Sequence, residues 1–146
     1  MTPLRVVVYG EVSTAHRPRY SGTTKRGKPI MRSDEGFRDW KARCARAASE
    51  ARVEWERLNG PWATEGVRYA VRCLALLSAD RKDADSVGRG FLDGCEGVLW
   101  RNDRACRPVI LDCETTTGRP RIVVDVIPYD PESELISVEI RWHGDG

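Results

Sequence analysis

The sequence predicts a single α/β (α+β) domain in which two main helices pack against one mixed β-sheet. Its length of 146 residues is that of one ordinary domain. Runs of β-branched and apolar residues have strand length, and two other stretches repeat apolar residues at helical spacing. A hydrophobic fraction of 40% and a charged fraction of 32% exclude a fibrous or wholly disordered chain.

The first half of the chain predicts a strand, a loop and a long helix. Leu4–Tyr9 is β-branched and apolar, which favours a strand. Residues 11–32 have no periodicity, which predicts a long, flexible basic loop. A helix follows, capped by Ser33 or Asp34 and ended by Asn59–Pro61. Its apolar stripe consists of Phe37, Trp40, Cys44, Ala47, Ala51, Trp55 and Leu58.

The second half predicts another strand, a shorter helix and a hairpin. Val67–Leu77 has the apolar character of a strand, and Ser86–Leu99 follows as a helix. Glycines within this helix lower its intrinsic propensity by up to about 1 kcal/mol each. They indicate either close packing against other elements or a helix held by tertiary contacts, and they are Gly88, Gly90, Gly94 and Gly97. Val109–Glu114 and Arg121–Val126 are strands joined by turn residues, and we expect them to pair as a hairpin.

Residues 130–146 predict a C-terminal extension with a fifth strand over Leu135–Trp142, so that residues 1–146 form one domain. No run of 18 apolar residues occurs, and the N-terminal residues do not have the pattern of a signal peptide. We therefore expect a cytoplasmic protein without a membrane partner. The five cysteines lack CxxC spacing and predict reduced, mostly buried thiols.

Positive charge is concentrated near the N-terminus. Residues 1–33 hold seven bases and one acid, whereas the rest of the chain holds seventeen bases and twenty-one acids. A basic loop of this kind suits binding to nucleic-acid phosphates, because neutralising them releases counterions. The candidate DNA-binding residues are Arg17, Arg19, Lys25, Arg26, Lys28 and Arg32. A solvated surface loop with no partner explains the same composition equally well.

Carboxylates surround the shorter predicted helix. Asp83 and Asp85 lie two residues apart at its start, and residues so spaced in an extended segment point the same way. Both could bind one hard cation, and Asp103 would join them if the chain reverses after the helix. With Arg89 nearby, these acids form a set typical of metal-assisted phosphoryl transfer. The structural alternative is that they are helix-capping and turn residues.

At these residues the sequence resembles the RusA family of Holliday junction resolvases. Asp83–Arg89 fills the family's Asp-x-Asp-Asn-x-x-Lys pattern, and Phe91–Leu99 matches the helix that follows it. Asn102–Cys106 matches the segment in which the family has Asp-Asp, and Gly10–Arg19 resembles its basic loop after the first strand. The resemblance covers about residues 4–126 and includes the order of strands and helices.

The resemblance implies a homodimeric endonuclease that depends on Mg²⁺, with Mn²⁺ as an alternative ion. Such an enzyme resolves four-way DNA junctions in recombination and repair by paired nicking of phosphodiesters. Carried over by position, Asp83, Asp85 and Asp103 would bind the metal and act in catalysis, and Arg89 would replace the family's lysine. Asp93 we interpret as a structural helix residue.

Three positions depart from the family pattern. Ser86 replaces Asn, Arg89 replaces Lys, and Asn102 replaces the first Asp of the Asp-Asp pair. Arginine keeps a positive charge but not the compact geometry or the titratable proton of lysine. These departures leave a second hypothesis open, a branched-DNA binding protein on the same scaffold that is catalytically weak or inactive.

Overall fold

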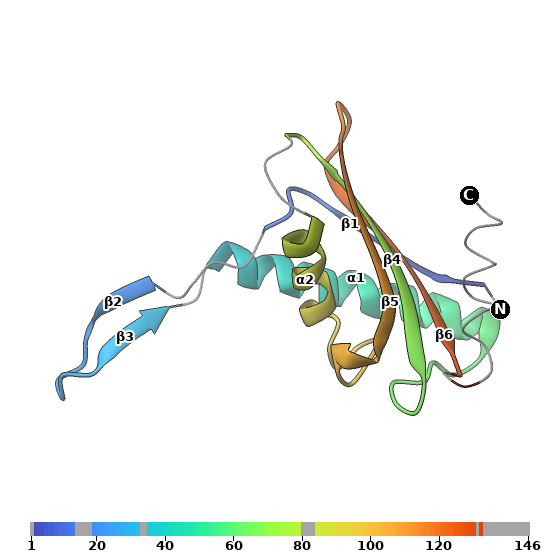
Figure 1. The fold of residues 1–146 in the computed structure, drawn as a ribbon, viewed down its shortest axis with the longest axis horizontal. Helices are drawn as coiled ribbons and strands as arrows, with labels where there is room; N and C mark the ends of the chain where they lie inside the picture. The colour runs from blue at the N-terminus through green and yellow to red at the C-terminus, as the bar shows by residue number, and fades with distance from the viewer. Residues whose placement is uncertain (1, 14–18, 33–34, 80–83, 131, 133–146) are drawn as a thin grey trace.

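The computed structural model describes residues 2–13, 19–32, 35–79, 84–130 and 132 (Figure 1). Within them, a four-stranded sheet, a separate two-stranded hairpin and two α-helices make up an α+β fold. The elements are β1 (Leu4–Tyr9), β2 (Arg19–Thr23), β3 (Pro29–Arg32), α1 (Glu35–Asn59), β4 (Arg68–Leu77), α2 (Ala84–Gly94), the 3₁₀ turn η1 (Asp103–Ala105), β5 (Cys106–Thr115) and β6 (Arg121–Tyr129). The predicted caps Ser33 and Asp34 and the fifth strand lie outside the described residues.

The main sheet is mixed, as predicted, and its strand order is β1-β6-β4-β5. β4 runs parallel to β5 and antiparallel to β6, and α2 lies in the crossover that a parallel pair requires. The predicted hairpin of Val109–Glu114 with Arg121–Val126 is wrong, because β4 separates these strands. β6 is the more apolar and fills the centre, whereas β5 alternates with exposed polar residues and suits an edge.

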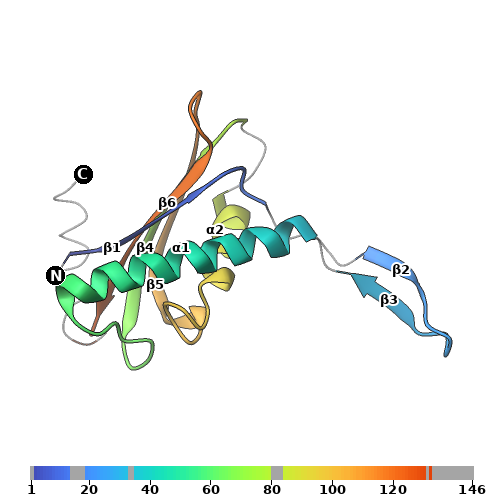
Figure 2. The same cartoon turned by 180° about the vertical axis from the view of Figure 1, so that it is seen from behind.

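Most of the core lies between the two helices and one face of the sheet. A single buried cluster contains residues of α1, α2 and all four strands. On the opposite face, the described residues form a small second buried cluster, Ala70, Ile127 and Tyr129. The sheet also carries an ion pair between Arg5 and Asp125 at 2.8 Å. α1 continues past the sheet toward the hairpin of β2 and β3, which projects away from the body (Figure 2).

The segment expected to be an unstructured basic loop contains this hairpin. Arg19 pairs with Arg32 and Tyr20 with Met31 in antiparallel register. The connecting turn is closed by a hydrogen bond from the Thr24 amide to the Lys28 carbonyl at 2.8 Å. Gly27 adopts a φ of +79°, which favours glycine. The two strands are too short and polar to produce a periodic pattern in the sequence. Only the turn residues between them indicate a hairpin.

The second helix is shorter than predicted and ends at Gly94 instead of Leu99. The Cys95 amide still bonds to the Phe91 carbonyl, but Gly97 then takes a φ of +83° and donates to the Trp100 carbonyl at 2.8 Å. This reversal allows Leu99 and Trp100 to be fully buried. The gain from burying Trp100 therefore outweighs one further turn of a glycine-rich helix.

Close packing explains three of the four glycines singled out in the sequence, whereas Gly97 lies beyond α2, with a φ of +83° and no atom close to a Cβ placed there. A Cβ atom on Gly90 would lie 3.0 Å from the Phe37 ring, and one on Gly94 would lie 2.8 Å from the Lys41 carbonyl oxygen. On the opposite side, a Cβ on Gly88 would meet the side chain of Leu111 on β5. The missing side chains thus let α2 approach both α1 and the sheet.

Aromatic and sulfur side chains fill the core. Trp55, Trp62, Tyr69, Trp100 and Phe91 form a continuous series of ring contacts with centroid separations of 4.9–6.4 Å. All four tryptophans within the described ranges are buried, as expected for core residues. Four of the five cysteines are buried and all are free, which confirms the prediction. Burial raises the pKa of the Cys44 and Cys73 thiols to about 12.

We predict that Gly94→Ala lowers the free energy of unfolding by about 1–2 kcal/mol, because overpacking against the Lys41 backbone exceeds the gain in helix propensity. The matched control is Gly118→Ala, whose Cβ would meet Thr116 Oγ1 at an ordinary 3.5 Å. Urea denaturation of both variants measures the difference. Equal stability of the two variants would show that α2 does not depend on this contact.

Candidate metal centre and nucleic-acid surface

Three carboxylates meet where α2 ends. Asp93 lies in the last turn of α2, Glu96 follows it, and Asp103 begins η1. One oxygen from each of them lies within 4.8 Å of the other two. We call Asp93, Glu96 and Asp103 the acidic cluster. All three side chains are accessible to solvent to some degree, so a ligand can reach them.

The return of the chain from α2 to β5 builds this cluster. The Trp100 indole N–H donates to the Leu92 carbonyl at 3.1 Å, which holds the returning segment against α2. Asn102 caps η1 by accepting the Arg104 amide at 2.9 Å, and the Glu96 carboxylate accepts the Asp103 amide at 3.3 Å. Trp100 is therefore a structural anchor of the site, because its fully buried ring is not exposed to a DNA base.

The charges within the cluster repel one another. Burial raises the pKa of the Asp93 carboxyl, and the negative charges of Asp103 and Glu96 raise it further. The positive charges of Lys41 and Arg89 act in the opposite direction. Convergent carboxylate oxygens are the donors that Mg²⁺, Mn²⁺ and Ca²⁺ prefer. The chemistry of this donor set therefore fits a hard divalent cation, without distinguishing among these ions.

The predicted ligands are only partly described. Asp83 lies outside the described residues. Asp85 lies by its backbone in the first turn of α2, not in the extended segment that the sequence predicts, and its side chain is not described. Asp103 is in the acidic cluster. Asp93 lies eight positions after Asp85 in the helix, a rise of about 12 Å along the helix axis. Convergence of Asp83, Asp85 and Asp103 on one ion stays a prediction. Within one chain, ligands at the start of α2 and a ligand beside its end would have to reach the same ion across most of the helix.

Two residues of the cluster were not predicted as ligands. Asp93 was interpreted as structural, and Glu96 had no assigned role, although the pair is spaced at i and i+3. That spacing places two residues on the same side of a helical turn. The signal that could have identified them is this spacing, combined with a glycine that reverses the chain toward Asp103. Arg89 is exposed on α2, one turn before Asp93, and its charge acts on that carboxyl.

The predicted DNA-binding residues are also only partly described by the structure. Lys25, Arg26 and Lys28 are exposed at the tip of the hairpin. Arg19 and Arg32 face each other in the backbone register of β2 and β3, but their side chains are not described. Arg17 lies outside the described residues. The hairpin thus presents at least its three tip bases to solvent.

The chain leading to the hairpin is held by contacts with α1 and β4. The Arg43 guanidinium donates to the carbonyl oxygens of Tyr9 at 2.7 Å and Glu11 at 3.4 Å, and it lies over the Trp40 ring. Gly10 permits this contact, since a Cβ atom there would collide with the guanidinium. The Ser78 hydroxyl donates to the Glu11 carboxylate. The segment that directly follows β1 is therefore fixed to the end of the sheet.

An acidic cluster suited to a divalent cation and a projecting basic hairpin are both typical of metal-dependent nucleic-acid enzymes. Residues 10–127 match the family model described as Endodeoxyribonuclease RusA, which covers most of the chain. The chain belongs to the RusA family of Holliday junction resolving endodeoxyribonucleases. No protein among the curated sequences matches it. In the described part of the chain, no helix has the length and apolar character to cross a membrane.

We predict that Glu96→Gln stabilises the metal-free protein by about 0.5 kcal/mol, because it removes one like charge at a solvent-accessible site and keeps an oxygen acceptor for the Asp103 amide. In millimolar Mn²⁺ the order should reverse, since the wild type gains more from binding. Thermal denaturation in EDTA and in Mn²⁺ measures both effects. Identical behaviour of the two proteins in both buffers would exclude Glu96 from the cation's surroundings.

Proposed function

We propose that the protein is a homodimeric, Mg²⁺-dependent resolvase that cuts four-way DNA junctions by paired nicking. The observation that carries this proposal is the placement of acids along α2. Asp85 is at its first turn, Asp93 at its last, and Glu96 and Asp103 lie just beyond. Membership of the RusA family supplies the substrate class, and the basic hairpin tip is consistent with it.

The polar side of α2 is the proposed catalytic surface. Asp85, Arg89 and Asp93 recur every fourth residue, so they follow one side of the helix. The opposite side packs into the core through Val87 and Phe91. Because α2 is fixed by its glycines, the acids and Arg89 keep a constant spacing that can match a DNA strand lying along the helix.

Asp83, Asp85 and Asp103 are the proposed metal ligands, with Mg²⁺ as the expected ion and Mn²⁺ as its substitute. A bound divalent cation supplies charge neutralisation at the scissile phosphate and makes water a better nucleophile. Arg89 would donate to the non-bridging oxygens of that phosphate and stabilise the additional charge that develops during attack. The guanidinium of Arg89 can replace a lysine as a positive charge. It cannot replace a lysine that donates its proton, because a guanidinium does not titrate in the accessible pH range.

A homodimer provides a physical solution to the separation between Asp85 and Asp103. A two-fold dimer has two equivalent sites, which matches two symmetric strands at a junction. If two α2 helices lie antiparallel across the interface, the start of one faces the end of the other. Asp83 and Asp85 would then share a site with Asp103 of the partner subunit, and the rise of about 12 Å within each helix would no longer keep them apart.

Asp103→Asn is expected to reduce Mg²⁺-dependent cleavage of a synthetic four-way junction by at least about 100-fold, because it removes one charged ligand. Binding of the junction in EDTA should change less than twofold. The matched control is Asp112→Asn, an exposed acid on β5 whose side-chain oxygen caps its neighbour's amide and would be retained. Full activity of the Asp103→Asn variant would refute the assigned metal role.

Mixing inactive variants tests the shared site. Asp85→Asn and Asp103→Asn should each be inactive alone, but heterodimers formed by co-refolding would contain one site with both acids intact. We expect the mixture to recover single-strand nicking at a level well above either variant. If the mixture is as inactive as its components although heterodimers form, the acids act within one subunit.

The second hypothesis, a junction binder that does not cut, rests on Arg89 and Asn102. Asn102 acts as the cap of η1, a role that an aspartate performs equally well, so its amide does not require the loss of a metal site. A wild-type protein that binds junctions with strong salt dependence, yet leaves them intact in both Mg²⁺ and Mn²⁺, would favour the binder.

A further inference from the structure

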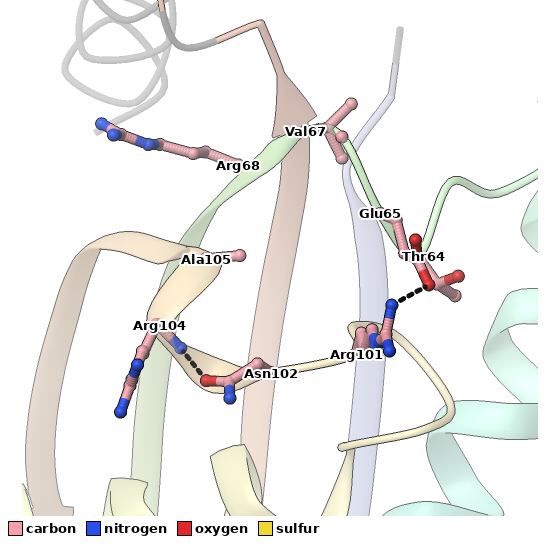
Figure 3. A pocket seen from close by; sticks show the side chains of 9 residues that line it. Thr64, Glu65, Val67, Arg68, Arg101, Asn102, Arg104 and Ala105 are labelled. Carbon is pink, nitrogen blue, oxygen red and sulfur yellow. Dashed lines mark hydrogen bonds and ion pairs between the residues drawn. The ribbon is translucent and has the colours of Figure 1, made fainter.

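A second cationic surface lies beside the acidic cluster, on the side of the molecule formed by η1 and the start of β4. A cavity of about 520 Å³ opens there, and its charged lining residues are Arg68, Arg101, Arg104 and Glu65 (Figure 3). We call it the arginine pocket. It does not involve the hairpin, which supplies the basic residues assigned so far to DNA binding.

The charges of the arginine pocket are not balanced. Arg101 pairs with Glu65 at 3.1 Å, and its amide donates to the Thr64 carbonyl. The charge of Arg101 is therefore balanced by Glu65 within the pocket. Arg68 and Arg104 are exposed, and among the residues that the structure describes neither has a carboxylate partner. In Figure 3 they extend to the same side of the pocket, away from the Arg101–Glu65 pair.

The pocket and the acidic cluster share one turn of chain. Asn102 and Arg104 line the pocket, and Asp103 between them belongs to the cluster. The η1 cap fixes this turn, because Asn102 accepts the Arg104 amide and Glu96 accepts the Asp103 amide. Any group bound by Arg104 is therefore held in a defined position relative to the proposed catalytic acids.

The geometry points to the arginine pocket as a second DNA-backbone site, in which Arg68 and Arg104 bind phosphates flanking the one that is cut. Exposed guanidinium groups recognise phosphate oxygens through paired N–H donors. Such contacts position DNA without reading its sequence. The inference rests on the proposed function, since the flanking phosphates belong to the junction arm that enters the site.

The assignment has a structural consequence for how DNA is held. The hairpin projects from the body, whereas η1 and the start of β4, which line the arginine pocket, lie at one end of the sheet (Figure 1). A duplex arm gripped at only one point can rotate about it. Two separated contact regions restrict this rotation and align a phosphodiester with the acids.

The test uses the full-length protein and a fluorescently labelled four-way junction in EDTA, where cleavage plays no part. Arg68→Gln and Arg104→Gln should each raise the dissociation constant by roughly three- to tenfold and lower the salt-dependence slope by about one. Arg57→Gln is the matched control, because it removes the same charge from an exposed arginine. Arg57 lies in the last turn of α1, where it pairs with Glu54. Arg104→Lys should recover only part of the affinity, since it restores the charge but not the paired N–H donors.

Arg68 makes the result decisive, because it lies on β4 and not on the turn that carries Asp103. Unchanged affinity and slope in both glutamine variants, equal to the Arg57→Gln control, would overturn the assignment. Loss of affinity in Arg104→Gln alone would also overturn it, since that result would reflect a disturbed η1 turn. If the wild type binds but does not cut in Mg²⁺, the proposed function fails while this comparison in EDTA still decides the arginine pocket.

Discussion

The close contact between α2 and α1 at Gly94 is the constraint on which the site depends. The α-carbon of Gly94 faces the Lys41 carbonyl and Cys44, at a separation that leaves no room for a side chain. Gly90 allows a similar approach to Phe37 and Trp40 one turn earlier. Together they fix the C-terminal end of α2, and the acidic cluster begins there with Asp93. A helix free to shift outward would separate Asp93 from Asp103.

The reversal after Gly94 places opposite charges on neighbouring surfaces. Burial of Trp100 and Leu99 draws the chain back toward the core, and the η1 turn follows immediately. Asp103 then joins the acids, while Arg104 joins the arginine pocket. A negative site that repels phosphate by itself is thus bordered by positive charge. This arrangement suits a DNA-cutting enzyme, because the strand must approach carboxylates closely without being excluded by them.

Much of the architecture could be predicted because its elements carry strong local patterns. The long stripe of α1 and the apolar runs of β1, β4 and β6 gave the mixed sheet with two helices. Strand pairing could not be predicted, because the turn residues after β5 suit a hairpin, whereas the greater apolar content of β6 places it between β1 and β4. The end of α2 could not be predicted either, because it depends on burial of Trp100 against distant parts of the chain.

The acidic cluster shows the same limit at the level of function. The sequence predicts Asp103 as a metal ligand, from its spacing after the carboxylate pair and its place in a family pattern. It gives Glu96 no such role, because only the reversal at Gly97 brings Glu96 beside Asp103. The arginine pocket combines Arg68 with Arg104, residues on separate elements with no common motif. Both sites bring together residues that are distant in the sequence, through a chain reversal or through neighbouring elements at one end of the sheet. Residue spacing along the sequence does not predict such proximity.

Anomalous scattering from crystals grown or soaked in Mn²⁺ would locate a cation bound at the end of α2. We expect a peak coordinated by a carboxylate oxygen of Asp103, and its loss in Asp103→Asn crystals. A well-diffracting crystal in millimolar Mn²⁺ with no peak at Asp103, Asp93 or Glu96 would show that these acids do not form a metal centre.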